Sequence, residues 1–146
     1  MVGDARQVSL EVARAVIRAG QDKAREIGVP MNIAVVDAGA NLIAFERQDG
    51  ARRGSLDMAQ KKALVARAFD IQTSALAEYT RSGEPFFGIH VSSRGKVMVF
   101  AGGIPFKIGD EVVGAVGGSG GLGGQDQAVA EAAATAFTAQ ACRRAA

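Results

Sequence analysis

Apolar residues near the start of the chain recur at the spacing of a helix. Between Ser9 and Gly28, the positions that include Val12, Val16 and Ile17 fall on one face, while charged residues occupy the others. This period is typical of an amphipathic helix. The hydroxyl of Ser9 is suited to cap its first turn, and Gly28 is suited to end it. We predict a helix between these two residues.

Two short runs rich in β-branched residues follow, at Met31–Asp37 and Leu42–Glu46. Four residues separate them, which is the spacing of a hairpin. Asp37, Gly39 and Asn41 are common turn formers. We therefore predict a β-hairpin, and we favour a turn role for Asp37 over a catalytic one.

A long helix is predicted from Ser55, as candidate N-cap, to about Phe69. Alanines line its inner side, which indicates close packing against a sheet or a second helix. Lys62 falls on the same side as Met58 and Val65. Lys62 would either reach into a pocket or pack its stem and carry its ammonium group to water. We favour the second outcome.

Shorter elements are expected next along the chain. Thr73 would cap a helix that ends at Thr80, and residues 81–87 (RSGEPFF) form a loop rich in helix breakers. The runs Ile89–Ser92 and Val97–Phe100 have the composition of strands.

The last hairpin has the clearest local signal. Ile104–Ile108 and Val112–Val116 flank Gly109 and Asp110, with glycine where a tight turn needs a positive φ. An alanine-rich helix follows. Strands in adjacent hairpins pair antiparallel, and amphipathic helices need the apolar face of a sheet. The predicted fold class is therefore α+β, an antiparallel sheet flanked by helices in the order α-β-β-α-α-β-β-β-α.

A glycine-rich stretch, Glu111–Gln127, joins the last strand to the last helix. Seven glycines lie between Gly114 and Gly124, and residues without a Cβ let backbone or ligand approach closely. The amides that open the helix, with the hydroxyl of Ser119, could bind an anion. We favour packing, because Asp126 in the first turn competes with any bound anion. The stretch matches neither a P-loop nor a Rossmann fingerprint.

Composition bounds the remaining possibilities. The 146 residues are 48% hydrophobic and 22% charged, which predicts one globular domain over residues 1–146. The 17 basic and 15 acidic residues are scattered, so we expect no nucleic-acid partner. A single cysteine, Cys142, fits a reducing compartment, and no apolar run reaches membrane-spanning length. We expect a cytoplasmic protein without a membrane partner.

Several motifs, in order along almost the whole chain, resemble the GlcG/HbpS family, also called the heme-degrading domain. They are IAVVDAGANLIAFERQDGA at 33–51, QKKA at 60–63, GGIP at 102–105 and the stretch 111–126. The resemblance extends to the C-terminal domain of PduO-type cobalamin adenosyltransferases. It implies a profilin-like fold, a homo-oligomer and, in some members, heme binding.

His90 is the only histidine of the chain, and it follows Phe86 and Phe87. An imidazole beside aromatic side chains is a reasonable axial ligand for heme iron, and Arg94 and Lys96 would face the propionates. Without a C-x-x-C-H motif, any heme would be bound noncovalently. The alternative is a half-buried, hydrogen-bonded strand histidine, with His90 and Ser92 on one face of the strand.

Two functional hypotheses from different classes remain open, besides a purely structural role. In the first, the protein binds heme or another tetrapyrrole, and the glycine-rich segment with Gly118, Ser119 and Gly120 lines the pocket. In the second, it is a cofactor-independent isomerase, hydratase or lyase. There His90 would act as acid or base, and Lys62, Arg47 or the glycine amides would hold a substrate carboxylate.

Overall fold

The computed structural model describes residues 6–145. Its elements follow the chain in the order α1 (Leu10–Ile27), β1 (Asn32–Asp37), β2 (Leu42–Arg47), α2 (Ser55–Phe69), α3 (Thr73–Tyr79), β3 (Gly103–Ile108), β4 (Glu111–Ser119) and α4 (Gly123–Ala145). Two single-turn 3₁₀ helices, Ile89–Val91 and Ser93–Gly95, lie between α3 and β3.

The four strands form one antiparallel sheet in the order β2-β1-β4-β3. The strands β1 and β4 are central, and β2 and β3 are the edges. Each strand is joined to its sequence neighbour by one of the two predicted hairpins, and β1 pairs with β4 to unite them. The α+β fold class predicted from the sequence is confirmed.

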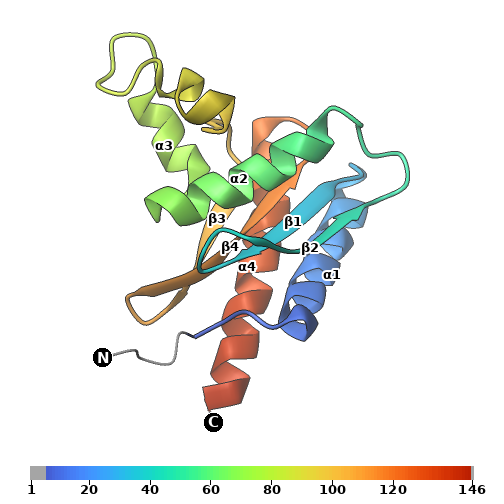
Figure 1. The fold of residues 1–146 in the computed structure, drawn as a ribbon. Coiled ribbons are helices and arrows are strands. Elements are labelled where there is room, and N and C mark those ends of the chain that lie inside the picture. The colour runs from blue at the N-terminus through green and yellow to red at the C-terminus, as the bar shows by residue number, and fades with distance from the viewer. Residues whose placement is uncertain (1–5, 146) are drawn as a thin grey trace.

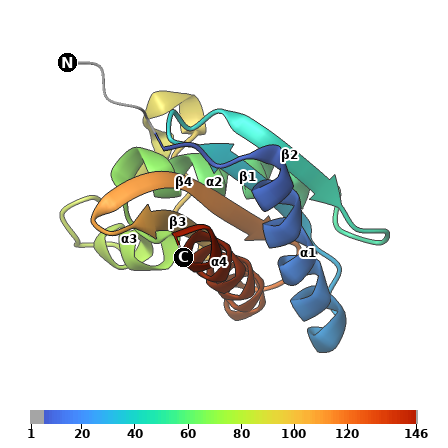
Figure 2. The same cartoon turned by 90° about the horizontal axis from the view of Figure 1, so that it is seen from below.

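Helices cover both faces of this sheet (Figures 1 and 2). Ile33 and Val35 of β1 belong to a large apolar cluster with α1 and α4. Ala34 and Val36, which point the other way, pack with the alanines of α2. Successive side chains of a strand alternate between its two faces, so β1 is buried on both sides. The small residues between β1 and α2 allow the helix to lie close to the sheet.

The predicted caps were correct at only one of three helix starts. The Oγ of Ser9 accepts a hydrogen bond of 3.2 Å from the amide of Val12, as expected for an N-cap. Ser55, however, is the first residue of α2 and makes no capping bond. Thr73 was also predicted as a cap, but its Oγ1 accepts the Gly103 amide at 2.8 Å and ties α3 to β3.

The predicted strands at Ile89–Ser92 and Val97–Phe100 are wrong. Residues 89–91 and 93–95 form 3₁₀ turns, and no strand lies between the end of α3 at Tyr79 and the start of β3 at Gly103. The backbone has positive φ at Gly88 (94°), Ser93 (51°) and Arg94 (60°), and such residues interrupt an extended chain. Residues 80–100 instead form an arm that leads away from the end of α3 (Figure 1). We call residues 80–100 the arm.

Candidate functional site

A buried ion pair joins α2 to the start of α4. The Nζ of Lys62 lies 2.8 Å from Oδ2 of Asp126, and the two side chains are only 1% and 6% exposed. The helical period turns Lys62 inward among the alanines of α2, and Asp126 lies in the first turn of α4. The prediction that the Lys62 ammonium group reaches water is wrong, because the β4–α4 junction supplies a charged partner inside the protein.

Lys62 makes two further hydrogen bonds, to the Gly118 carbonyl (3.1 Å) and the Ser119 hydroxyl (3.2 Å). These partners and Asp126 satisfy the three donors of an ammonium group. Burial lowers the pKa of Lys62 from 10.5, and the bond and attraction to Asp126 oppose that shift. All three donors are engaged, so Lys62 has none left for a substrate carboxylate.

The second oxygen of Asp126 occupies the anion-binding position expected at the glycine-rich turn. Its Oδ1 accepts the amides of Gly120 (3.1 Å) and Gly121 (2.8 Å). An anion at a helix start is stabilised by such amides and by the helix dipole. The protein therefore fills this position with its own carboxylate, which supports the packing interpretation of the glycines.

The glycines of β4 and the following turn pack directly against backbone. A Cβ on Gly117 would collide with the carbonyl oxygen of Ala59 in α2, and one on Gly120 would collide with that of Pro30. Gly118, Ser119 and Gly120 are all buried. The structure therefore places these three residues in a packed junction, and none of them lines the two cavities described below.

His90 lies in the first 3₁₀ turn of the arm and is exposed. Its ring is 6.4 Å from that of Phe87 in an edge-to-face arrangement. Phe86 is 51% exposed and Phe87 is 63% exposed. The expected half-buried strand histidine is wrong, because the arm turns here.

The other side chains expected near heme also belong to the arm. Arg94 and Lys96 are exposed, four and six residues after His90. Tyr79, at the end of α3, is 48% exposed. Sequence reasoning missed two exposed apolar side chains on the arm, Val91 (72%) and Phe100 (56%). Val91 and Phe100 were predicted to lie in strands, and nothing in the sequence marked their side chains as exposed.

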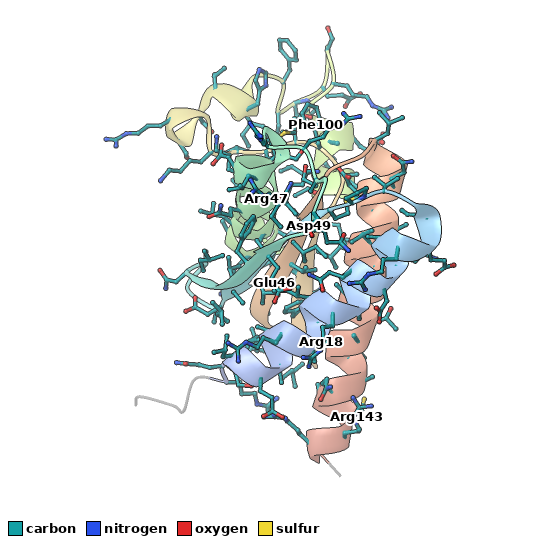
Figure 3. The ribbon with its side chains drawn as sticks, turned by 90° about the vertical axis from the view of Figure 1, so that its right-hand side faces the viewer. Arg18, Glu46, Arg47, Asp49, Phe100 and Arg143 are labelled. Atoms are coloured by element: carbon teal, nitrogen blue, oxygen red, sulfur yellow. The ribbon has the colours of Figure 1, made fainter. Side chains whose placement is uncertain are left out.

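Arg47 ends the edge strand β2 and lines two adjoining cavities of about 620 and 340 Å³. Figure 3 shows it on the same face as Glu46 and Asp49. Neither cavity is lined by Lys62 or His90. The structure thus separates the three residues proposed for a catalytic site: one is on the arm, one is inside the protein and one is at the edge of the sheet.

These features define a small α+β protein with helices on both faces of one antiparallel sheet and an exposed arm. A family model described as "Haem degrading protein HbpS-like" matches residues 8–135. The chain belongs to this HbpS-like family, which confirms the resemblance inferred from its motifs.

Related proteins support the assignment. An uncharacterised 15.0 kDa protein of Citrobacter freundii, from the dhaT-dhaS intergenic region, is 33% identical over 90% of this chain and 92% of its own. Protein GlcG of Escherichia coli K12 is 33% identical over 75% of this chain and 79% of its own. The corrinoid adenosyltransferase PduO of C. freundii is 32% identical over 91% of this chain, which spans only 40% of PduO.

Two solved structures have closely similar folds. The Klebsiella pneumoniae protein ORFY has a TM-score of 0.87 at 32% identity, covering 95% of this chain and 98% of its own. A complex of PduOC with heme has a TM-score of 0.86 at 29% identity, covering 90% of this chain and 95% of its own. None of the helices in residues 6–145 combines the length and the apolar character needed to cross a membrane.

Proposed function

We propose that this protein binds heme or a related tetrapyrrole noncovalently, through the arm. The observation that carries the proposal is the position of His90, an exposed imidazole beside the exposed ring of Phe87. Support comes from the family and from the heme complex of a relative with 29% identity. We further propose that the chain forms a single domain and that the protein is cytoplasmic. Its one cysteine fits the reducing environment of that compartment.

The residues of the arm fit such a ligand chemically. Exposed apolar surface concentrated on one segment is typical of a binding surface, and a tetrapyrrole offers a large flat apolar face. A neutral imidazole is a common axial ligand of heme iron. When bound, heme would supply redox and small-molecule ligation chemistry. The chain itself would contribute the His90 nitrogen, aromatic contact from Phe86 and Phe87, and positive charge from Arg94 and Lys96 near the propionates.

Absorbance titration of the purified protein with hemin tests the proposal. We expect a saturable Soret shift, because imidazole ligation changes the electronic environment of the iron. In His90→Ala the band should be lost or moved, and in Ser92→Ala, which alters an exposed neighbour that cannot replace the imidazole, it should be retained. Featureless, non-saturating absorbance in the wild-type protein would contradict the proposal.

We also propose that the protein is a homo-oligomer, since exposed apolar side chains of the arm favour burial against a second copy. Light scattering of the apo protein at micromolar concentration should give a mass above 15.0 kDa. Phe87→Ser should lower that mass if the arm is buried between copies. Leu122→Ser is the matched control, because Leu122 is similarly exposed at 73% but lies just before α4 and outside the arm. A monomeric wild-type protein would contradict this part.

A further inference from the structure

We propose that a second site, separate from the arm, binds a small monoanionic carboxylate between the guanidinium groups of Arg47 and Arg53. Asp49 forms the third charged side of this site. The three residues line one cavity of about 340 Å³ together with Gly50 and Ala51. This inference does not depend on heme binding, because none of the lining residues belongs to the arm.

The cavity shares two lining residues with a larger neighbour. Arg47 and Asp49 also line the cavity of about 620 Å³ between the end of α1 and the end of β2. Figure 3 shows Arg47 and Asp49 on this face of the molecule. The two cavities thus share these two residues, and the larger one extends to the end of α1.

The loop that presents the site is held in place by hydrogen bonds. Gln48 makes two hydrogen bonds with the backbone of Met31. Its side-chain Oε1 accepts from the Met31 backbone amide at 2.9 Å, and its own backbone amide donates to the Met31 carbonyl at 3.0 Å. Its Nε2 donates to the Gln21 carbonyl of α1 at 3.4 Å. The Arg52 carbonyl accepts from the buried Asn32 side chain at 3.0 Å. Gln48, between Arg47 and Asp49, and Arg52, next to Arg53, are thus held in place before any ligand arrives, which reduces the entropy cost of binding.

The charged groups of the site are free of internal partners. Within residues 6–145, neither Arg47 nor Arg53 takes part in any of the ion pairs found. By contrast, Arg25 on the rim of the larger cavity bonds to Asp22 at 2.9 Å. The Glu46 carboxylate is likewise engaged, because its Oε2 accepts a hydrogen bond of 2.6 Å from the side-chain Nε2 of Gln21. Arg47, Arg53 and Asp49 therefore remain available to a ligand.

The charge balance selects the class of ligand. Two guanidinium groups and one carboxylate give the smaller cavity a formal charge of 2 − 1 = +1. Guanidinium forks match the two oxygens of a carboxylate in bidentate geometry. A monoanion would neutralise the site, whereas a dianionic phosphate would leave it with a net charge of −1 beside Asp49. We therefore assign the site to a small monocarboxylate.

The test is NMR titration of the full chain with acetate at constant ionic strength, following the arginine Nε–H signals. We expect saturable shifts of Arg47 and Arg53, and weaker shifts with inorganic phosphate. Arg47→Gln and Arg53→Gln should each raise the acetate dissociation constant at least tenfold. Arg25→Gln should change it less than twofold, because that guanidinium is already paired.

Three outcomes would overturn the inference. They are the absence of saturable acetate shifts in the wild-type protein, tighter binding of phosphate than of acetate, and equal effects of Arg25→Gln and Arg47→Gln. Far-UV circular dichroism of each variant checks that it is folded. His90→Ala should keep full acetate binding. This variant therefore distinguishes a failure of the carboxylate-site proposal from a failure of the heme proposal.

Discussion

Lys62 and Asp126, 64 positions apart in the chain, meet in the interior with 2.8 Å between Nζ and Oδ2. Each also bonds to the β4–α4 junction, through Gly118, Ser119 and the amides of Gly120 and Gly121. The pair therefore fixes α2 to the place where the sheet gives way to α4. Taking two charges out of water is costly, and these extra hydrogen bonds offset that cost.

Removing the charge of Asp126 should strongly destabilise the protein. In Asp126→Asn the buried ammonium group of Lys62 loses its counter-ion, and we expect a loss of about 3–5 kcal/mol in the free energy of unfolding. Urea denaturation measures it. The control is Asp57→Asn, which breaks the exposed pair with Lys61 on the same helix and should cost less than about 0.5 kcal/mol.

Removing both charges should restore part of this stability. Lys62→Met/Asp126→Asn leaves no unpaired buried charge, and the side-chain oxygen of the new asparagine can still accept hydrogen bonds from the Gly120 and Gly121 amides. The double variant should therefore be more stable than Asp126→Asn alone. If the two losses simply add, the side chains are not coupled.

The lowered pKa of Lys62 gives the stability a defined dependence on pH. Burial lowers the native pKa below 10.5, the ordinary lysine value. Between the two values the unfolded chain binds more protons than the native one, so the free energy of unfolding rises with pH. We expect wild-type protein to gain stability relative to Lys62→Met as pH rises through this range. Urea midpoints of both proteins measured across the alkaline range would show it, and a constant or falling difference would contradict it.

The glycines of the junction should matter for folding before they matter for any ligand. In Gly117→Ala the new methyl group would meet the Ala59 carbonyl of α2, so α2 must shift, at a cost of about 1–3 kcal/mol. Gly124→Ala is the matched control, because a Cβ there has no atom within 4 Å and alanine favours a helix. We expect the control to keep or slightly raise the thermal midpoint. Equal effects of the two changes would show that close packing is not the reason for Gly117.

Local chemistry made much of the fold predictable. The β1–β2 turn is held by Asp37, whose Oδ1 accepts the amides of Gly39 and Asn41 at 2.9 Å, as short-range turn preferences indicate. The second hairpin turns at Gly109 with φ of 61°. These features depend on neighbours in sequence, which a single chain displays directly.

Long-range partners could not be predicted in the same way. Lys62 is one lysine among alanines, and nothing near it in sequence indicates a carboxylate 64 positions later. The strands predicted for the arm were wrong for a different reason. Its composition favours strands, but non-glycine residues such as Ser93 and Arg94 adopt positive φ there, and propensity does not predict that conformation.

His90→Ala should separate function from stability. His90 is exposed on the arm and makes no side-chain hydrogen bond within the described residues, so its removal should change the free energy of unfolding by less than about 0.5 kcal/mol. Phe106→Ala is the contrasting variant, because Phe106 is 1% exposed and stacks on Phe137 with ring centres 4.3 Å apart. That change should cost about 3–5 kcal/mol. A large loss of stability in His90→Ala with unchanged hemin binding would mean that the imidazole has a structural role, whereas unchanged stability with a lost Soret shift is the result expected of a ligand to iron.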